Sequence, residues 1–449
     1  MSTESEASAA GLPVPGPVPP LRVGRVSQSR LSNGGQVLVV PRPSVPRVEF
    51  RLSVPAGAAI GSSVAQAELL RSGMMLGTRD LDQEQLSEQI QRLGGSLSVG
   101  QDQDRLQITA SALAEAEEDL YRLLGALVAG PDFPEPALAI EKAKLQEGLR
   151  MARATPSFPA SERLQRLIYG SHPYGRQEPT DRQVEQVRRS QLLALHRHSF
   201  STTATQITVV GQVRPSRTEA WLERHFGRRR GAARAWAVGP PPRRPASPVI
   251  TFIDRPGSVQ TVILMGASGP PQGHRTHLPL SLAAAVLGGS FSCRLMANLR
   301  EDKGYTYGAH ARGHTHLTDT LLAVETEVRT EVTAPAFTEL LYELGRLATV
   351  DVGGDELERT KTYLEGARLV MLQTQAGLAD ALARVRAHGL DHRYLERYAQ
   401  RLSGVSAQEL RRATAQHLSP ASLSTVMVGD ARRALPDLRA VATVRRAGP

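Results

Sequence analysis

The sequence predicts an α+β protein made of two duplicated domains, because similar strand patterns occur twice. Residues 48–58, VEFRLSVPAGA, alternate as a half-buried strand does, and residues 260–270, QTVILMGASGP, repeat this pattern in the second half. Each half also closes on a similar apolar strand, TQITVVGQV (205–213) and LSTVMVGD (423–430). An internal duplication is the simplest explanation, although short apolar strands can resemble each other by chance.

Helical periodicity separates these strands in both halves. Residues 82–95, DQEQLSEQIQRLGG, and residues 335–350, PAFTELLYELGRLATV, place apolar side chains at i, i+3 and i+4. We therefore expect a disordered proline-rich arm (1–27), an N-terminal domain (28–213), a basic Pro/Arg-rich linker (214–247), a C-terminal domain (248–432) and a tail (433–449).

The length and the charge fit a large multidomain protein and argue against nucleic-acid binding. A chain of 449 residues is longer than one hydrophobic core usually organises. The formal charge is +10, yet much of the excess lies in RHFGRRRGAARAWAVGPPPRRP (224–245), a run that is typical of a solvated linker. Aromatic residues make up 4% of the chain, which counts against a stacking surface for single strands.

Cysteine usage and the N-terminus bear on the compartment. Cys293 is the only cysteine, so neither an intrachain disulfide nor a zinc site made of thiolates can form. The first residues, MSTESEASAAGLPVPGPVPPLRVG, lack the basic and apolar regions of a secretory signal. No run of about 18 apolar residues is present, so we expect no membrane span. These features favour the cytoplasm.

Four segments together resemble the insulinase/pitrilysin superfamily of inverted-motif zinc peptidases. They are Gly77-Thr78 at the end of an early helix, LGGSLSV (93–99), His172-Pro173-Tyr174-Gly175, and GGSFSCRLMANLREDKGYTYGA (288–309). The last segment is the most specific, whereas HPYG alone is a weak signal. The resemblance extends from about residue 30 to 432. It implies that each domain is an antiparallel-rich sheet packed with helices and that the chain forms a peptidase-like half-chamber.

The resemblance also implies that the zinc motif of the family is degenerate here. Active members carry H-x-x-E-H on the helix that ends at the Gly-Thr pair. The corresponding positions hold Glu68, Arg71 and Ser72. A guanidinium about 4 Å from a unit positive charge costs on the order of 4 kcal/mol at an effective dielectric of 20, and twice that beside a dication. We therefore expect this chain to bind no metal, with zinc on a partner chain.

Other acidic residues and histidines in the sequence are candidate metal ligands. The family supplies a distal glutamate near IEKAKLQEGLRM (140–151), where Glu141 and Glu147 are more simply surface helix residues. HGLDH (388–392) mimics the zinc motif with Asp391 in the glutamate position, but Gly389 indicates a turn between helices.

Three further histidines, His310, His314 and His316, share parity and face one way on a strand. The outer two lie about 20 Å apart, so only His314 and His316 could share an ion. Surface histidines are the simpler interpretation.

The second half keeps two residues of the family's substrate machinery. Arg300 and Tyr307 occupy the positions of an arginine–tyrosine pair that, in the family, reaches substrate at the zinc site of a closed chamber. A guanidinium fork can hold a peptide carbonyl or carboxylate, and a phenol can donate to an oxyanion. Two alternatives stay open: Arg300 pairs with Glu301 or Asp302, and Tyr307 is a core residue. Tyr305 is the weaker candidate because it lies out of register.

These features favour a non-catalytic, zinc-less subunit of a heterodimeric zinc peptidase. The combination is similar to the metal-less subunits of two-chain, processing-peptidase-like members. The resemblance implies a homologous partner that carries H-x-x-E-H and a peptide or unfolded protein as substrate. A structural or assembly protein of the same fold is the alternative. A self-sufficient metallopeptidase that uses Glu68 or the His314/His316 pair is the third hypothesis.

Overall fold

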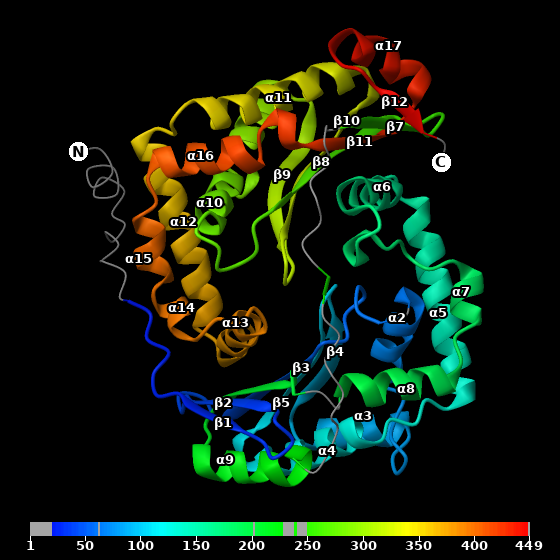
Figure 1. The fold of residues 1–449 in the computed structure, drawn as a ribbon, viewed down its shortest axis with the longest axis vertical. Coiled ribbons are helices and arrows are strands. Elements are labelled where there is room, and N and C mark those ends of the chain that lie inside the picture. Colours follow the sequence, from blue (N-terminus) through cyan, green and yellow to red (C-terminus); the bar gives the residue numbers. More distant parts are fainter. Residues whose placement is uncertain (1–19, 62, 201–202, 228–237, 240–248, 448–449) are drawn as a thin grey trace.

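The computed structural model describes residues 20–61, 63–200, 203–227, 238–239 and 249–447. Figure 1 shows two sheets, one in each half of the chain, with helices packed around both. Each sheet has six strands, in the orders β1-β2-β6-β3-β5-β4 and β12-β7-β11-β8-β10-β9. The strands of the first sheet are β1 (Ser27–Arg30), β2 (Gln36–Pro41), β3 (Arg47–Val54), β4 (Ser96–Gln101), β5 (Leu106–Leu113) and β6 (Gln206–Gly211). Those of the second are β7 (Ile250–Asp254), β8 (Gln260–Gly269), β9 (Thr306–Thr315), β10 (Thr320–Arg329), β11 (Ser424–Gly429) and β12 (Arg445–Ala447).

The two sheets confirm the predicted duplication. The order β2-β6-β3-β5-β4 in the first half corresponds strand by strand to β7-β11-β8-β10-β9 in the second. In both sheets the first of these pairs is parallel, and the remaining neighbours, β6-β3-β5-β4 and β11-β8-β10-β9, pair antiparallel. The fold is therefore α+β with antiparallel-rich sheets, as the strand patterns and the resemblance indicated.

The helices begin and end close to the positions that the periodicity predicts. Helix α3 starts at Asp82, whose side chain accepts from the backbone N–H of Gln85 while Gln85 bonds back to Asp82. The first half contains α2 (Val64–Gly73), α3 (Gln83–Arg92), α4 (Glu117–Ala129), α5 (Glu135–Ala154), α6 (Ser157–Tyr169), α7 (Asp181–Glu185), α8 (Arg189–Phe200) and α9 (Pro215–Leu222). The second contains α10 (His277–Gly288), α11 (Thr333–Thr349), α12 (Gly354–Leu372), α13 (Gln375–Ala387), α14 (Arg393–Glu396), α15 (Tyr398–Ser403), α16 (Ala407–His417) and α17 (Ala431–Val441).

Short 3₁₀ and π-helical segments lie between the longer elements. The 3₁₀ segments are η1 (Ala114–Ala116), η2 (Pro173–Gly175), η5 (Thr330–Val332) and η6 (Pro420–Ser422). The π-helical segments are η3 (Glu223–Gly227) and η4 (Met296–Asp302). Because π-helical turns are rare and often occur at functional sites, the position of Arg300 in η4 is notable.

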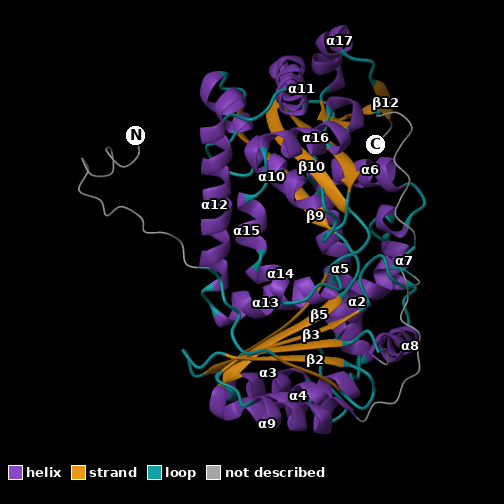
Figure 2. Ribbon diagram, turned by 60° about the vertical axis from the view of Figure 1, so that its left-hand side comes forward, coloured by secondary structure: helices purple, strands orange, loops and turns teal. Residues whose placement is uncertain are grey.

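The halves exchange helices across their inner faces. Helix α13 comes from the second half but packs on β2 and β6 of the first sheet, where Leu378 and Leu382 meet Leu38 and Val40. Helix α6 comes from the first half and packs on the second sheet. Figure 2 shows the first sheet between α13 on one side and α3, α4 and α9 on the other. The central strands of each sheet are thus covered on both faces.

This exchange corrects one expectation about the strands. The alternation in residues 48–58 predicted a half-buried strand, but β3 is buried on both faces after Arg47. Its polar residues lie under α13: the Arg51 side chain is 2% exposed, and Arg51 Nε donates to Asp380 of α13 at 2.5 Å. The sequence pattern cannot show a covering helix that comes from a distant part of the chain.

The predicted arm, linker and tail contain ordered structure. Of the arm, residues 20–26 are described, and Val23 is buried while its N–H donates to Glu396. The predicted linker begins with α9, and the predicted tail contains most of α17 and all of β12, which pairs with β7. Most of the basic run 224–245 lies outside the described residues. None of the helices in the described ranges has the length and apolar character needed to cross a bilayer.

Candidate functional site

Glu68, Arg71 and Ser72, at the degenerate zinc positions, lie on α2, where the charges of Glu68 and Arg71 neutralise each other. Glu68 Oε2 accepts hydrogen bonds from Arg71 Nε at 3.1 Å and from Arg71 Nη2 at 2.9 Å. The helix is capped by Ser63, whose hydroxyl accepts from the N–H of Gln66. The carboxylate of Glu68, which would have to bind the metal, is thus already paired with the guanidinium of Arg71. These residues therefore do not fit a zinc ion.

The other proposed carboxylate ligands are bound on their own helix. Glu141 accepts from Lys144 at 2.8 Å, and Glu147 pairs with Arg150, both within α5. Across the part of the chain that the structure describes, no group of three or more His, Cys, Asp or Glu side chains is arranged to hold a metal. Neither glutamate is placed in a ligand set.

A cavity of about 670 Å³ separates α2 from the second sheet. We call it the interdomain cavity, because both halves line it. It brings Glu68 together with His314 and His316, which come from the second half. Its other lining residues include Gln101, Asp102, Phe158, Leu164, Glu178, Leu264, Leu321, Ala323 and Glu325. The walls combine carboxylates with apolar side chains, so the cavity can accommodate a segment of mixed polarity.

The two cavity histidines differ in their environment. The pKa of His314 is lowered, first by desolvation and then by the neighbouring charges of His316 and Arg312. His316 Nδ1 lies 2.9 Å from Asp319 Oδ1, within the turn between β9 and β10. Because Asp319 is 1% exposed and engages one imidazole nitrogen of His316, that nitrogen is not free for an ion shared with His314.

The HPYG segment joins the two halves beside this cavity. Tyr174 donates its hydroxyl to Asp104 Oδ1 at 2.6 Å, and the N–H of Leu317 donates to Asp104 Oδ2 at 2.8 Å. We call these three residues the polar joint. Burial is the main cause of the raised pKa of Asp104, and the two hydrogen bonds oppose that shift. In the sequence, HPYG is only a weak signal, and no pattern links Tyr174 to residue 104 or 317.

Arg300 and Tyr307 lie away from the interdomain cavity. Arg300, in η4, places Cζ 4.4 Å over the ring of Phe291, and its Nε lies 3.6 Å from Glu301. Tyr307, near the start of β9, is 91% exposed and is therefore not a core residue, whereas Tyr305 is half-buried against the core of the second half. Seven residues of strand separate Tyr307 from His314, about 23 Å. The structure thus does not bring the pair to Glu68 within this chain.

HGLDH forms a turn, as its glycine indicated. Gly389 has a φ of 71° and connects α13 to α14. His388 lines a second cavity of about 630 Å³ between the halves, together with His277 and His314. Desolvation is the main cause that lowers the pKa of His388 to about 4.

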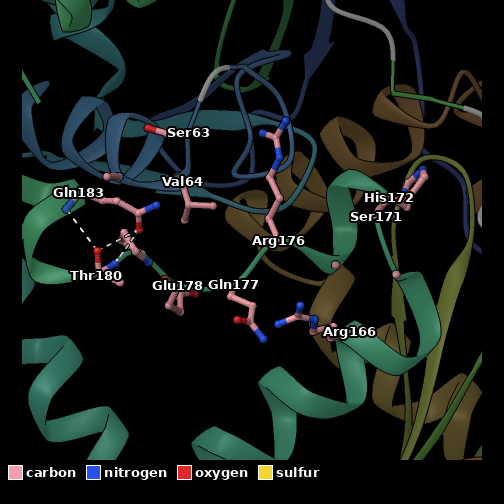
Figure 3. Close-up of a pocket in the computed structure, with 14 residues that line it drawn as sticks. Ser63, Val64, Arg166, Ser171, His172, Arg176, Gln177, Glu178, Thr180 and Gln183 are labelled. Carbon is pink, nitrogen blue, oxygen red and sulfur yellow. Dashed lines mark hydrogen bonds between the residues drawn. The ribbon is translucent and has the colours of Figure 1, made fainter. Parts of the chain in front are cut away.

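A third, more open pocket of about 540 Å³ lies on the other side of α2 (Figure 3). Its wall includes Ser63 and Val64 at the start of that helix, and the arginines Arg166 and Arg176. Arg166 lies on α6 and Arg176 on the segment between α6 and α7 (Figure 3), and Arg176 Nη1 donates to the carbonyl of Gly61 at 3.0 Å. Thr180 and Gln183 at its rim form the capping box of α7. Among its described residues, no hydrogen bond joins a hydroxyl of the lining to His172 or Glu178, so the pocket shows no activated nucleophile.

Comparison with known proteins places this geometry in a family. The family described as "Peptidase M16 inactive domain" matches residues 186–364, a range that contains Arg300 and Tyr307 but not α2. Over that range the chain is similar to the M16 peptidases, the insulinase and pitrilysin superfamily.

Curated relatives of this chain are described as uncharacterized zinc proteases. An uncharacterized zinc protease of Mycobacterium tuberculosis is 24% identical over 311 residues, which are 67% of this chain and 70% of that protein. The uncharacterized zinc protease YmxG of Bacillus subtilis is 21% identical over 345 residues, 76% of this chain and 83% of that protein.

Solved structures show the same fold. The crystal structure of a peptidase M16 inactive domain from Pseudomonas fluorescens aligns with a TM-score of 0.83 and 22% identity, covering 94% of this chain and 99% of that chain. A protease from Helicobacter pylori aligns with a TM-score of 0.82 and 17% identity, covering 90% and 99%. The M16 fold therefore extends over nearly the whole chain.

Proposed function

We propose that this chain is the non-catalytic subunit of a two-chain zinc peptidase. It contributes half of the proteolytic chamber together with Arg300 and Tyr307, which bind a peptide or an unfolded protein. Zinc and the water-activating glutamate come from a homologous partner that carries H-x-x-E-H. The cofactor thus belongs to the partner, and this chain acts on the substrate.

The ion pair between Glu68 and Arg71 is the observation that carries this proposal. At these positions the family's ligands are replaced by a neutral pair, in which the Arg71 guanidinium donates two hydrogen bonds to one carboxylate oxygen of Glu68. A metal bound here would have to displace Arg71 and then remain beside its charge. The same contacts argue against a self-sufficient peptidase, because Glu68 and His316 each already have a partner.

The exposed groups of the second half support a role in substrate binding. In the described part of the chain, the Tyr307 hydroxyl makes no hydrogen bond and its side chain faces solvent. Arg300 stacks through the face of its guanidinium, which leaves its N–H groups at the edges able to donate. An exposed phenol and an exposed guanidinium whose O–H and N–H donors are available can both donate to a carbonyl or to a developing oxyanion.

The test is hydrolysis of a quenched fluorescent peptide library with added zinc. The purified chain, an H-x-x-E-H homologue from the same cell, and their mixture are compared. We expect turnover of the mixture to exceed that of the homologue alone. In the mixture, Tyr307→Phe should lower kcat about 100-fold, since removing one oxyanion donor costs 10²–10³ in kcat, and Arg300→Ala should raise KM.

Tyr363→Phe is the matched control, because Tyr363 is also an exposed tyrosine, at 50%, but lies on α12. It should leave kcat and KM unchanged. If the mixture is no faster than the homologue, or if both changes at Arg300 and Tyr307 leave turnover intact, the chain is a structural subunit instead.

A further inference from the structure

We infer that Phe291 is the positioning residue that presents Arg300 to the substrate. This inference rests on the proposed function and adds a residue to it. Phe291 is 68% exposed, which is unusual for a ring of that size. Its contact with a charged group is the stack under the Arg300 guanidinium, with Cζ 4.4 Å from the ring centre. An aromatic face within about 6 Å of a guanidinium attracts it through the ring quadrupole.

The backbone that carries Arg300 is held firmly. Asn298 donates to Glu339 and to Glu343 of α11, each at 3.0 Å, and Leu299 is fully buried. The N–H of Ala309 on β9 donates to the sulfur of Met296 at 3.4 Å. These contacts fix η4 against a helix on one side and a strand on the other. The start of the Arg300 side chain is therefore fixed, while its tip is not.

The loop that carries Phe291 is anchored as well. Gly288 ends α10 against β9, where an added Cβ would lie 2.2 Å from the backbone nitrogen of Ala311. Arg294 donates two hydrogen bonds to Glu356 of α12, at 2.8 and 2.7 Å. Phe291 thus projects from a loop that is tied at both ends, so its exposed ring is a fixed surface and not a side chain on a mobile loop.

Among the described residues, two groups restrain the tip of Arg300. One is Phe291, and the other is Glu301, whose carboxylate lies 3.6 Å from Nε, longer than a hydrogen bond. The Arg300 side chain is 34% exposed, so water screens that ion pair. Stacking uses none of the five N–H donors, whereas pairing with Glu301 competes for them. Phe291 can therefore orient the guanidinium without consuming the donors that a peptide needs.

The test uses the mixture of this chain with the H-x-x-E-H homologue and one quenched peptide that the mixture cleaves. Phe291→Leu removes the π face and keeps an apolar side chain, whereas Phe291→Tyr keeps the face. Because a stack at an exposed site contributes about 0.5–1 kcal/mol, we expect Phe291→Leu to raise KM about two- to five-fold with kcat nearly unchanged. Phe291→Tyr should stay within twofold of the original chain, and so should Tyr363→Leu, an exposed aromatic removed elsewhere.

A double-mutant cycle separates this inference from the proposed function. If Phe291 acts through Arg300, then Phe291→Leu has no further effect once Arg300→Ala is present. An unchanged KM for Phe291→Leu, a loss that persists beside Arg300→Ala, or a loss that follows weaker association of the two chains would overturn the inference. If Arg300→Ala itself changes nothing, the proposed function fails first. The original chain and the three variants of the cycle therefore give different patterns for the two failures.

Discussion

Arg71 and Arg300 illustrate how single residues acquire roles through their neighbours. Both are arginines on helical segments, yet one is neutralised by Glu68 and the other stacks on an exposed ring. The register of the motif predicted that Arg71 opposes a metal. The register did not predict that Phe291 lies under Arg300, because a stacking contact depends on side-chain directions at a loop and a π-helical turn.

His388 gives a prediction at this scale. Its pKa in the folded chain is lowered to about 4, while an unfolded histidine titrates near 6.5. The unfolded chain therefore binds more protons between these values. The stability due to neutral His388 is fully present above pH 6.5 and is lost as the pH falls through 4. Its full size is up to about 3 kcal/mol.

Replacing His388 with Asn should flatten the fall in thermal stability on acidification. The measurement is Tm for both chains at pH 7.5 and pH 5. The pKa values of His277 and His314 are also lowered, and that of Asp104 is raised. The comparison therefore uses the difference in Tm between the original chain and the variant at each pH. A difference in Tm that is the same at both pH values would contradict the assignment to His388.

Elements from the two halves meet at the polar joint, where the turn between β4 and β5 contacts the turn between β9 and β10. The joint depends on Asp104, which is 4% exposed and accepts from Tyr174 and from the N–H of Leu317. Removing an acceptor leaves buried donors without partners, which costs about 1–3 kcal/mol for each. The polar joint thus contributes more to the free energy of unfolding than an exposed ion pair of the same chain does.

Asp104→Ala should lower the free energy of unfolding by about 2–4 kcal/mol, and Tyr174→Phe by less, since the phenol is then absent and the Leu317 bond remains. Chemical denaturation measures both changes. Hydrogen exchange at the Leu317 amide should speed up in Asp104→Ala and stay slow in Tyr174→Phe. Replacing Asp80, an exposed aspartate, with Ala is the control. If Asp104→Ala and the control have the same free energy of unfolding, the polar joint does not stabilise the fold.

The whole molecule is organised by the exchange of α6 and α13. Each helix covers the inner face of the sheet that belongs to the other half. Arg51 reinforces the exchange, since its buried guanidinium also donates to the carbonyl of Ala376 on α13. Neither half can therefore bury its sheet on both faces without the other.

We predict that neither half folds stably alone. Residues 249–449 lack α6, which leaves the apolar residues of β8 and β11 exposed, and residues 1–248 lack α13 over β2 and β6. Circular dichroism and size-exclusion chromatography of each half, and of the two halves expressed together, measure this. We expect a cooperative melting transition only for the co-expressed pair. A separate half that melts cooperatively as a monomer would refute the prediction.

The sequence by itself determined the duplication, the strands near 48–58, 205–213, 260–270 and 423–430, the helices near 82–95 and 335–350, and, through the resemblance, which three residues stand at the zinc-motif positions. Those features are local: periodicity of two or 3.6 residues, a capping box at Asp82, and the identity of three residues within two turns of α2. The tertiary structure decided which helix covers which sheet, what Tyr174 binds, and what holds Arg300. Each of these contacts joins segments that are distant in the chain or depends on side-chain direction, and the spacing of residues along one segment carries no information about either.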